Sequence, residues 1–165
     1  MMTRMPAMHE VDQLPPLLER TIPAAWEDLN GHVNVRHYLE LYDQAGWPML
    51  SQIGIEEHHF HEERRGLFDL EHHIWYLAEM HVGDLVTVHS RILERNAKRF
   101  HGVMFVANRT QQRVASAFEY VTTGADLEAR STAPLPDTVA ARLDEIIAAD
   151  VRLSWPAPVC GVISV

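Results

Sequence analysis

The sequence has one cysteine, few basic residues and no long hydrophobic run. Because Cys160 is the only cysteine among 165 residues, an intramolecular disulfide and a thiolate metal cluster are both excluded. No segment approaches the length of a transmembrane helix, and the first residues, MMTRMPAMHEVDQ, lack the apolar segment of a signal peptide. We therefore expect a cytoplasmic protein with no membrane partner.

Basic residues are outnumbered, with 14 Lys and Arg against 23 Asp and Glu and a formal net charge of -9. A nucleic-acid partner needs a basic surface, so we expect none. A small anionic ligand is still allowed, because a few local cations or a helix N-terminus can bind phosphate. The chain length favours a single domain, residues 1–165, with a loose N-terminal arm at 1–16 and a C-terminal helix and tail at 138–165.

A helical periodicity begins at Val35, from which hydrophobic residues recur three and four positions apart. Asn34 directly precedes this pattern and is suited to cap the helix. Pro48 is expected to kink or end the helix near Gly46. Gly46 would then either let the helix approach another backbone closely or belong to the turn before the proline.

Alternation with period two dominates the rest of the chain. Residues 17–26 predict a short edge strand, because Pro23 interrupts them. After a polar, histidine-rich loop at 54–66, four strands are expected as consecutive antiparallel hairpins, followed by an amphipathic helix at 137–150. This order predicts an α+β fold, in which a curved antiparallel sheet of about five strands wraps around one long helix. An edge strand of such a sheet could pair with a second copy of the chain.

The segment WEDLNGHVNVRHYLELYDQAGW, residues 26–47, joins a turn to the start of the long helix. Asp28 and Gly31 occupy the first and fourth positions of a predicted type I turn, and turn formation alone is one interpretation of Asp28. The other interpretation is chemical. A carboxylate there would lie beside the unpaired N–H groups of the helix start, which carry partial positive charge.

This segment resembles the hotdog-fold acyl-CoA thioesterases, which include the hydroxybenzoyl-CoA thioesterase type. The stretch YLAEMHVGDLVTV resembles the hairpin between the second and third strands of that family, and LEHHIWYLAE with KRFH resembles a subgroup associated with carnitine-type acyl-CoA breakdown. The resemblance covers residues 17–137. In the first segment it rests on Asp28, Gly31, His32, Val33, Asn34, Tyr38 and Leu39.

The resemblance implies hydrolysis of an acyl-CoA thioester, with no cofactor beyond the coenzyme A of the substrate. It implies that Asp28 acts as base or nucleophile and that the backbone N–H of Val35, beside the Asn34 cap, stabilises the oxyanion. His32 and Tyr38 would contact the substrate, although His32 could equally be a hydrogen-bonded structural histidine. Because this fold builds its site from two chains, a homodimer or homotetramer is expected.

Glu71 and His73 lie two residues apart on a predicted strand and therefore point the same way. A Glu-x-His pair stands at this place in the carnitine-type subgroup, which implies a substrate-binding role for both. Trp75 beside Glu71 would suit a cationic acyl group. Because Asp69 and Glu79 are predicted on the same face, a solvated surface is the alternative interpretation.

Two further groups of charged or metal-ligating residues are present. Lys98 and Arg99 fall near predicted strand ends and are candidates for binding the phosphates of coenzyme A, with solubility as the alternative role. Histidines 58, 59 and 61 lie in the predicted loop, where such clusters are usually solvated, so we expect no metal.

Two other functions compete with hydrolysis. An enoyl-CoA hydratase of the same fold would use Asp-x-Asn-Pro-apolar-His, but here Gly31 replaces the proline and His32 comes one residue early. A non-catalytic acyl-CoA-binding protein would leave Asp28 idle. No G-x-S-x-G sequence occurs, so a serine nucleophile elbow is not indicated.

Overall fold

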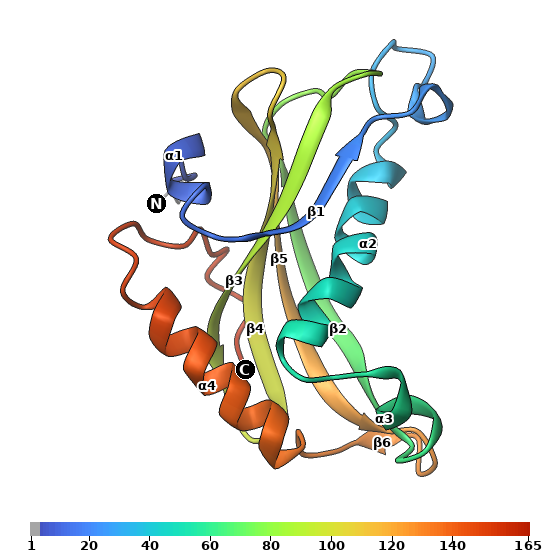
Figure 1. Cartoon of the computed structure of the whole chain (residues 1–165), viewed down its shortest axis with the longest axis vertical. Helices are drawn as coiled ribbons and strands as arrows, with labels where there is room; N and C mark the ends of the chain where they lie inside the picture. Colours follow the sequence, from blue (N-terminus) through green and yellow to red (C-terminus); the bar gives the residue numbers. More distant parts are fainter. Residues whose placement is uncertain (1–3) are drawn as a thin grey trace.

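The computed structural model describes residues 4–165 as one curved antiparallel sheet with one long helix on its concave side (Figure 1). This confirms the predicted α+β arrangement. None of the helices in the described residues is both long and apolar enough to cross a membrane. The elements are α1 (Met8–Val11), β1 (Pro16–Thr21), a 3₁₀ turn (Ala24–Trp26), α2 (Arg36–Gln52), α3 (Glu57–His61), β2 (Arg65–Tyr76), β3 (Leu85–Arg95), β4 (Arg99–Asn108), β5 (Arg113–Asp126), β6 (Ser131–Thr132) and α4 (Asp137–Asp150).

The strand order is β1-β3-β4-β5-β2, with the short β6 paired to β5. Strands β3, β4 and β5 form the predicted hairpins, but the prediction that β2 forms a hairpin with β3 was wrong. Residues 77–84 instead cross the end of the sheet, and β2 pairs with β5. Placing β1 and β2 at opposite edges lets the sheet curve around both sides of α2, which buries more of its apolar surface.

Helix α2 buries its apolar face against the sheet, with Leu41 and Ala45 fully covered. Pro48 was predicted to kink or end the helix near Gly46, and it does not end the helix, because α2 continues to Gln52. Met49 is buried beyond the proline, and this packing offsets the hydrogen bond that proline cannot donate. A methyl group added at Gly46 would meet no atom within 4 Å, so this glycine makes no close backbone approach.

The convex face of the sheet is covered by segments from both ends of the chain (Figure 1). Val11 and Leu14 are 0% and 4% exposed, so the predicted loose N-terminal arm is packed from α1 onward. Trp155, from the tail after α4, meets Phe105 with a ring-centroid distance of 5.8 Å. The arm and the tail therefore form a second apolar cluster on the side of the sheet opposite α2.

A β-bulge in β2 changes which residues face α2. Asp69 pairs with Thr122 while Glu71 pairs with Val121, so Leu70 is the extra residue. The predicted alternation placed Asp69 on the face of Glu71, and the bulge reverses this placement. Asp69 now shares the α2 side of the sheet with His72, and the carboxylate of Asp69 lies 3.3 Å from the His72 ring nitrogen.

Candidate active site

The predicted turn at Asp28 is present. The Gly31 N–H donates to the Asp28 carbonyl over 3.1 Å, and the Asp28 N–H donates to the His32 carbonyl over 2.9 Å. Gly31 has a φ of 80°, a left-handed conformation that favours glycine. The turn therefore holds Asp28 in a closed loop of five residues, 28–32.

Backbone hydrogen bonds close this loop at its base and fix it against a distant segment of the chain. Glu27 and Val33 form an isolated antiparallel bridge across its base. The Val33 N–H donates to the Met80 carbonyl over 2.8 Å, and the Asn34 N–H donates to the Trp26 carbonyl over 2.8 Å. As a result, the loop is held against the segment that follows β2.

The start of α2 is capped as predicted. The Arg36 N–H donates to the side-chain oxygen of Asn34 over 3.2 Å, which is the geometry of an N-cap residue. Among residues 4–165, the Val35 N–H has no hydrogen-bond acceptor, and Val35 is 57% exposed. One donor of the helix N-terminus is therefore available to a ligand.

A groove of about 390 Å³ joins the turn, the helix start and the end of β2. It brings together five of the predicted site residues and five that were not predicted. The predicted residues are Asp28, His32, Asn34, Val35 and Tyr38, and the others are Val33, Tyr76, Leu77, Ala78 and Glu79.

Asp28 is held as a carboxylate. The Asn30 N–H donates to its Oδ1 over 2.8 Å, and this bond lowers the pKa of Asp28 below its ordinary value. His32 Nδ1 lies 3.6 Å from the same oxygen and 3.3 Å from the Val33 carbonyl. Because its pKa is lowered, Asp28 is ionised at neutral pH, and its side chain, which is 18% exposed, is open to the groove.

Two tyrosines form an aromatic corner in the groove. The Tyr38 hydroxyl donates to the Ala78 carbonyl over 3.1 Å, which fixes this buried ring. The Tyr76 ring meets it at 89°, with the centroids 5.2 Å apart, and Tyr76 is 52% exposed. One sequence feature pointed to this part of the groove, the YLAE stretch, but it was interpreted as part of a hairpin between two strands.

The predicted substrate residues of β2 do not face this groove. Glu71, His73 and Trp75 do share one face, but it is the convex one, where the His73 and Trp75 rings lie 4.2 Å apart. Trp75 packs against the second apolar cluster. The prediction that these three residues contact a substrate bound beside Asp28 of the same chain is therefore wrong.

Lys98 and Arg99 are also outside the groove. Arg99 pairs with Thr123, whereas Tyr76, which lines the groove, pairs with Ser116 of the same strand. These two positions on β5 are seven residues apart, which corresponds to roughly 23 Å along a strand. Lys98 and Arg99 therefore lie far from Asp28 within the same chain.

A larger cavity of about 900 Å³ lies farther along α2, between the helix and β2. Its polar residues include Asp43 on the helix and the Asp69–His72 pair on the strand. Sequence reasoning missed it because the bulge at Leu70 is what directs Asp69 inward. Most of its lining is apolar, from residues such as Trp47, Phe60 and Phe118.

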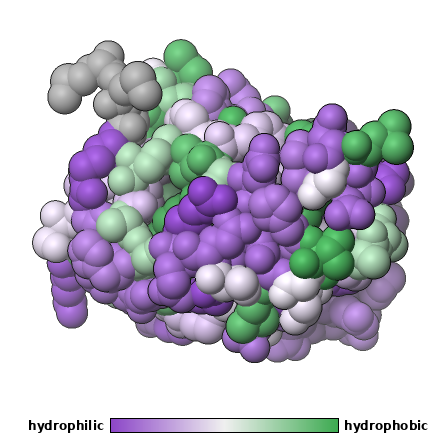
Figure 2. Space-filling view, turned by 90° about the horizontal axis from the view of Figure 1, so that it is seen from above, coloured by the Kyte–Doolittle hydropathy of each residue, from purple (hydrophilic) through white to green (hydrophobic). Residues whose placement is uncertain are grey.

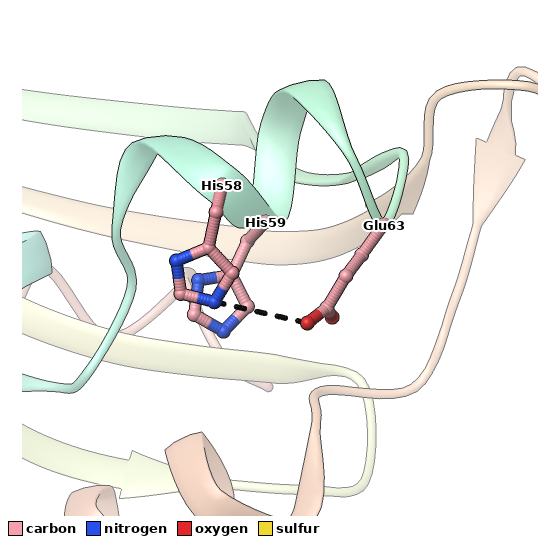
Figure 3. Close-up of side chains that lie close together, drawn as sticks. All are labelled: His58, His59 and Glu63. Carbon is pink, nitrogen blue, oxygen red and sulfur yellow. Dashed lines mark ion pairs between the residues drawn. The ribbon is translucent and has the colours of Figure 1, made fainter.

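The histidine-rich segment contains one group with metal-ligating side chains, His58, His59 and Glu63 on α3 and just after it (Figure 3). Their ligand atoms lie within 4.8 Å of one another, and His58 and Glu63 are exposed. Local contacts already hold these rings, since the Glu56 N–H donates to His59 Nδ1 over 3.1 Å and His58 lies 3.6 Å from Glu56. The short helix α3 replaces the predicted loop at this place.

The end of the molecule that Figure 2 views from above is mainly hydrophilic, with hydrophobic residues dispersed among polar ones. Elsewhere, two large apolar residues of edge strand β2 are exposed, Phe68 at 65% and Leu70 at 41%.

Residues 22–143 match the model of the Thioesterase-like superfamily. A betainyl-CoA thioesterase of Pseudomonas aeruginosa is 27% identical over 147 residues, covering 88% of this chain and 91% of that protein. An L-carnitine dehydrogenase/betainyl-CoA thioesterase of Rhizobium meliloti is 26% identical over 140 residues, covering 85% of this chain. The chain spans only 28% of the length of that second relative.

Solved structures show the same fold. The protein SAV2348 of Staphylococcus aureus, solved in complex with CoA, superposes with a TM-score of 0.81 at 20% identity and covers 92% of this chain and 96% of its own. A 1,4-dihydroxy-2-naphthoyl-CoA thioesterase of Synechocystis superposes with a TM-score of 0.69 at 21% identity, covering 78% of this chain and 95% of its own. The predicted hotdog fold is confirmed.

Proposed function

Because the chain belongs to the Thioesterase-like superfamily, we propose that it hydrolyses an acyl-CoA thioester in the Asp28 groove. One observation carries this proposal: an ionised carboxylate and an unpaired helix N-terminal N–H line the same groove. Thioester hydrolysis needs a nucleophile or base on one side of the carbonyl carbon and a donor for the oxyanion on the other.

In this mechanism the thioester carbonyl oxygen accepts a hydrogen bond from the Val35 N–H. The partial positive charge of the helix start stabilises the negative charge that develops on that oxygen. Asn34 contributes by capping the helix, so that the Val35 N–H stays directed at the groove rather than at another backbone carbonyl. The carbon–sulfur bond then breaks, and coenzyme A leaves as a thiolate that takes up a proton.

The pKa of Asp28 favours direct attack by its carboxylate over removal of a proton from water. A general base works best when its pKa lies near the operating pH, whereas the Asn30 N–H lowers the pKa of Asp28. An ionised carboxylate is able to form a covalent acyl intermediate. Attack by Asp28 would give a mixed anhydride, which water then hydrolyses to the free acid and the original carboxylate.

The acyl group of this proposal is small and cationic. Two relatives matched across most of this chain are named betainyl-CoA thioesterases. The groove beside Asp28, about 390 Å³, is enough for a short acyl group with part of the pantetheine arm. Betainyl-CoA, which carries a trimethylammonium group next to the thioester, is therefore the substrate we propose.

The test is thiol release from a panel of acyl-CoAs, which includes betainyl-CoA, straight-chain acyl-CoAs and an enoyl-CoA. Hydrolysis releases a thiol, whereas hydration removes the enoyl absorbance without releasing one. We expect thiol release, fastest with betainyl-CoA. Enoyl hydration alone would favour the hydratase alternative, and binding without either reaction would favour an acyl-CoA-binding protein.

We also propose that the working form is a homodimer or a homotetramer. The edge of β2 carries unpaired backbone groups together with exposed Phe68 and Leu70, which a second chain could cover. Such an assembly is also the way in which Lys98 and Arg99 of one chain could meet coenzyme A bound to another.

A further inference from the structure

The groove beside Asp28 contains a second carboxylate and an accessible aromatic ring that the hydrolytic chemistry does not use. Glu79 follows β2 and lines the groove, and its side chain is 66% exposed. Tyr76, the last residue of β2, lines the same groove with about half of its surface exposed. Neither residue is placed to attack the thioester or to bind its oxygen in the mechanism above.

We propose that Tyr76 and Glu79 form the site that recognises a quaternary ammonium group on the acyl chain and so determine the choice of substrate. This inference rests on the proposed thioesterase function, because it assigns residues to the substrate that the function requires. The Tyr76 ring supplies a cation–π surface, the Tyr38 ring closes the corner at right angles, and the Glu79 carboxylate supplies the opposite charge.

The chemistry of the substrate restricts where such a site can be. In a betainyl thioester the nitrogen is separated from the carbonyl carbon by a single methylene, so the ammonium must lie within the groove that holds the carbonyl. Besides Asp28, the lining of this groove contains one acidic residue, Glu79, and two aromatic rings, Tyr38 and Tyr76, together with His32. The cation site is therefore confined to this corner.

The charge around the corner also suits a cation. Burial raises the pKa of Tyr38, and the negative charge of Glu79 raises it further. The Glu79 carboxylate is therefore close enough to Tyr38 for its charge to influence this ring. Arg113, a cation whose charge also reaches Tyr38, does not line the groove, and its Nε donates to Gln111 over 2.7 Å. The lining itself offers an incoming ammonium two carboxylates and no arginine or lysine.

The carboxylates of the larger cavity are either too far from the thioester or already hydrogen-bonded. Asp43 is eight residues beyond Val35 on α2, which is roughly 12 Å along a helix axis. Asp69 is seven residues before Tyr76 on β2, which is roughly 23 Å along a strand. Glu40 is nearer, but its two oxygens already accept hydrogen bonds from His37 and Gln44.

The position first predicted for a cation site, Glu71 with Trp75, lies on the opposite face of the sheet. Trp75 and Tyr76 are adjacent residues of one strand, so their side chains point to opposite faces. In this proposal Tyr76 and Glu79 bind the cationic group, a role that the sequence pattern suggested for Trp75 and Glu71.

The experiment compares two substrates of nearly equal shape, betainyl-CoA and 3,3-dimethylbutyryl-CoA, in which carbon replaces the charged nitrogen. The measured quantity is the ratio of their kcat/KM values. We expect the wild-type ratio to exceed about 10, because an ammonium on an aromatic ring beside a carboxylate is favoured over its neutral isostere. Tyr76→Leu should lower the ratio about tenfold and Glu79→Gln about threefold, since Glu79 is more exposed to solvent.

Three controls separate recognition from folding and from chemistry. Tyr76→Phe keeps the aromatic ring and should therefore keep the ratio of kcat/KM values. If the Tyr76 hydroxyl had a structural role instead, this variant would change the ratio. Glu128→Gln, an exposed carboxylate beyond β5, should change neither substrate. The neutral substrate is the third control, because damage to the groove as a whole would lower kcat/KM for both substrates and leave their ratio unchanged, whereas loss of the ammonium partner lowers the ratio.

An unchanged ratio in both Tyr76→Leu and Glu79→Gln would overturn the inference, as would a ratio that responds to Glu71→Gln instead. A wild-type ratio near 1 with efficient thiol release would overturn the cation site and leave the thioesterase proposal standing. If no acyl-CoA is hydrolysed, the proposed function fails. The affinities of the same variants for a non-hydrolysable thioether analogue of betainyl-CoA then decide the cation site separately.

Discussion

The Asn30 N–H and the Asp28 carboxylate are joined by a 2.8 Å hydrogen bond within a single turn. A donor fixed two residues away stabilises the ionised form and lowers the pKa of Asp28. The bond also orients one carboxylate oxygen, Oδ1, so the turn that brings Asp28 to the groove also sets its charge.

This bond predicts the pH dependence of the reaction. Because the pKa of Asp28 is lowered from an ordinary value of about 3.9, kcat/KM for a stable acyl-CoA should be independent of pH down to about pH 5. The rate should fall only below that range, as the carboxylate becomes protonated. A profile of kcat/KM between pH 4 and 8 checks this, and an acid limb near pH 6 to 7 would show that a group with a higher pKa controls the reaction.

Direct attack by Asp28 predicts that oxygen from water enters the protein. Water can attack either carbonyl of a mixed anhydride, so repeated turnovers in ¹⁸O-labelled water should place the label in the Asp28 carboxylate. Mass spectrometry of the peptide containing Asp28 measures this, with enzyme incubated without substrate as the control. Label in the product acid together with an unlabelled Asp28 would favour attack by water with Asp28 as the base.

Local patterns in the sequence predicted the turn, the cap and the course of α2 up to Gly46. These features depend on neighbouring residues, such as Gly31 at a left-handed position and Asn34 directly before the helix. The faces of β2 could not be predicted, because the bulge at Leu70 shifts the alternation by one residue without a glycine or proline to mark it. The pairing of β2 with β5 is a contact between distant segments, which period and spacing do not encode.

The same limit explains the incomplete prediction of the groove. Asp28, His32, Asn34, Val35 and Tyr38 were found because they lie in one continuous segment. Tyr76 and Glu79 reach the groove through tertiary hydrogen bonds, from Val33 to Met80 and from Tyr38 to Ala78, which join segments forty or more residues apart. A residue that arrives through such a tertiary contact carries no local signal.

Buried His89 predicts a loss of stability in mild acid. Burial lowers its pKa, its Nδ1 donates to the Leu14 carbonyl over 2.8 Å, and its Nε2 lies 2.8 Å from an Arg109 nitrogen. The neighbouring charges are Arg109 and Asp12, which pair with each other. Since the folded pKa is below the unfolded value of about 6.5, the unfolded chain takes up the proton first. Stability attributable to His89 is therefore present above about pH 6.5 and decreases as pH falls toward the folded pKa.

The measurement is thermal unfolding of the wild type and His89→Gln at pH 7.5 and pH 5.5. Glutamine retains a donor and an acceptor but does not titrate, so the variant should lose less stability between these two values. The difference should not exceed about 1.4 kcal/mol per pH unit for one proton. Equal losses in both proteins would exclude His89 as a source of the acid sensitivity.

The exposed edge of β2 predicts self-association. Phe68 is 65% exposed on a strand with an unpaired edge, so Phe68→Lys should weaken the contact between two chains by charge and by lost apolar area. Light scattering coupled to size exclusion should give a dimer or tetramer for the wild type and a shift toward monomer for the variant. Glu128→Gln serves as the surface control, and a wild type that is monomeric at micromolar concentration would contradict the prediction.

The most direct test of the proposed chemistry is the rate of thiol release from betainyl-CoA by Asp28→Asn. The amide keeps the size of the side chain but is neither an effective nucleophile nor a base, so kcat should fall about 10²-fold or more. Glu128→Gln should keep the wild-type rate, and circular dichroism should show the same fold for all three proteins. Near-normal turnover by a folded Asp28→Asn variant would contradict the account, because the carboxylate would then have no part in breaking the thioester.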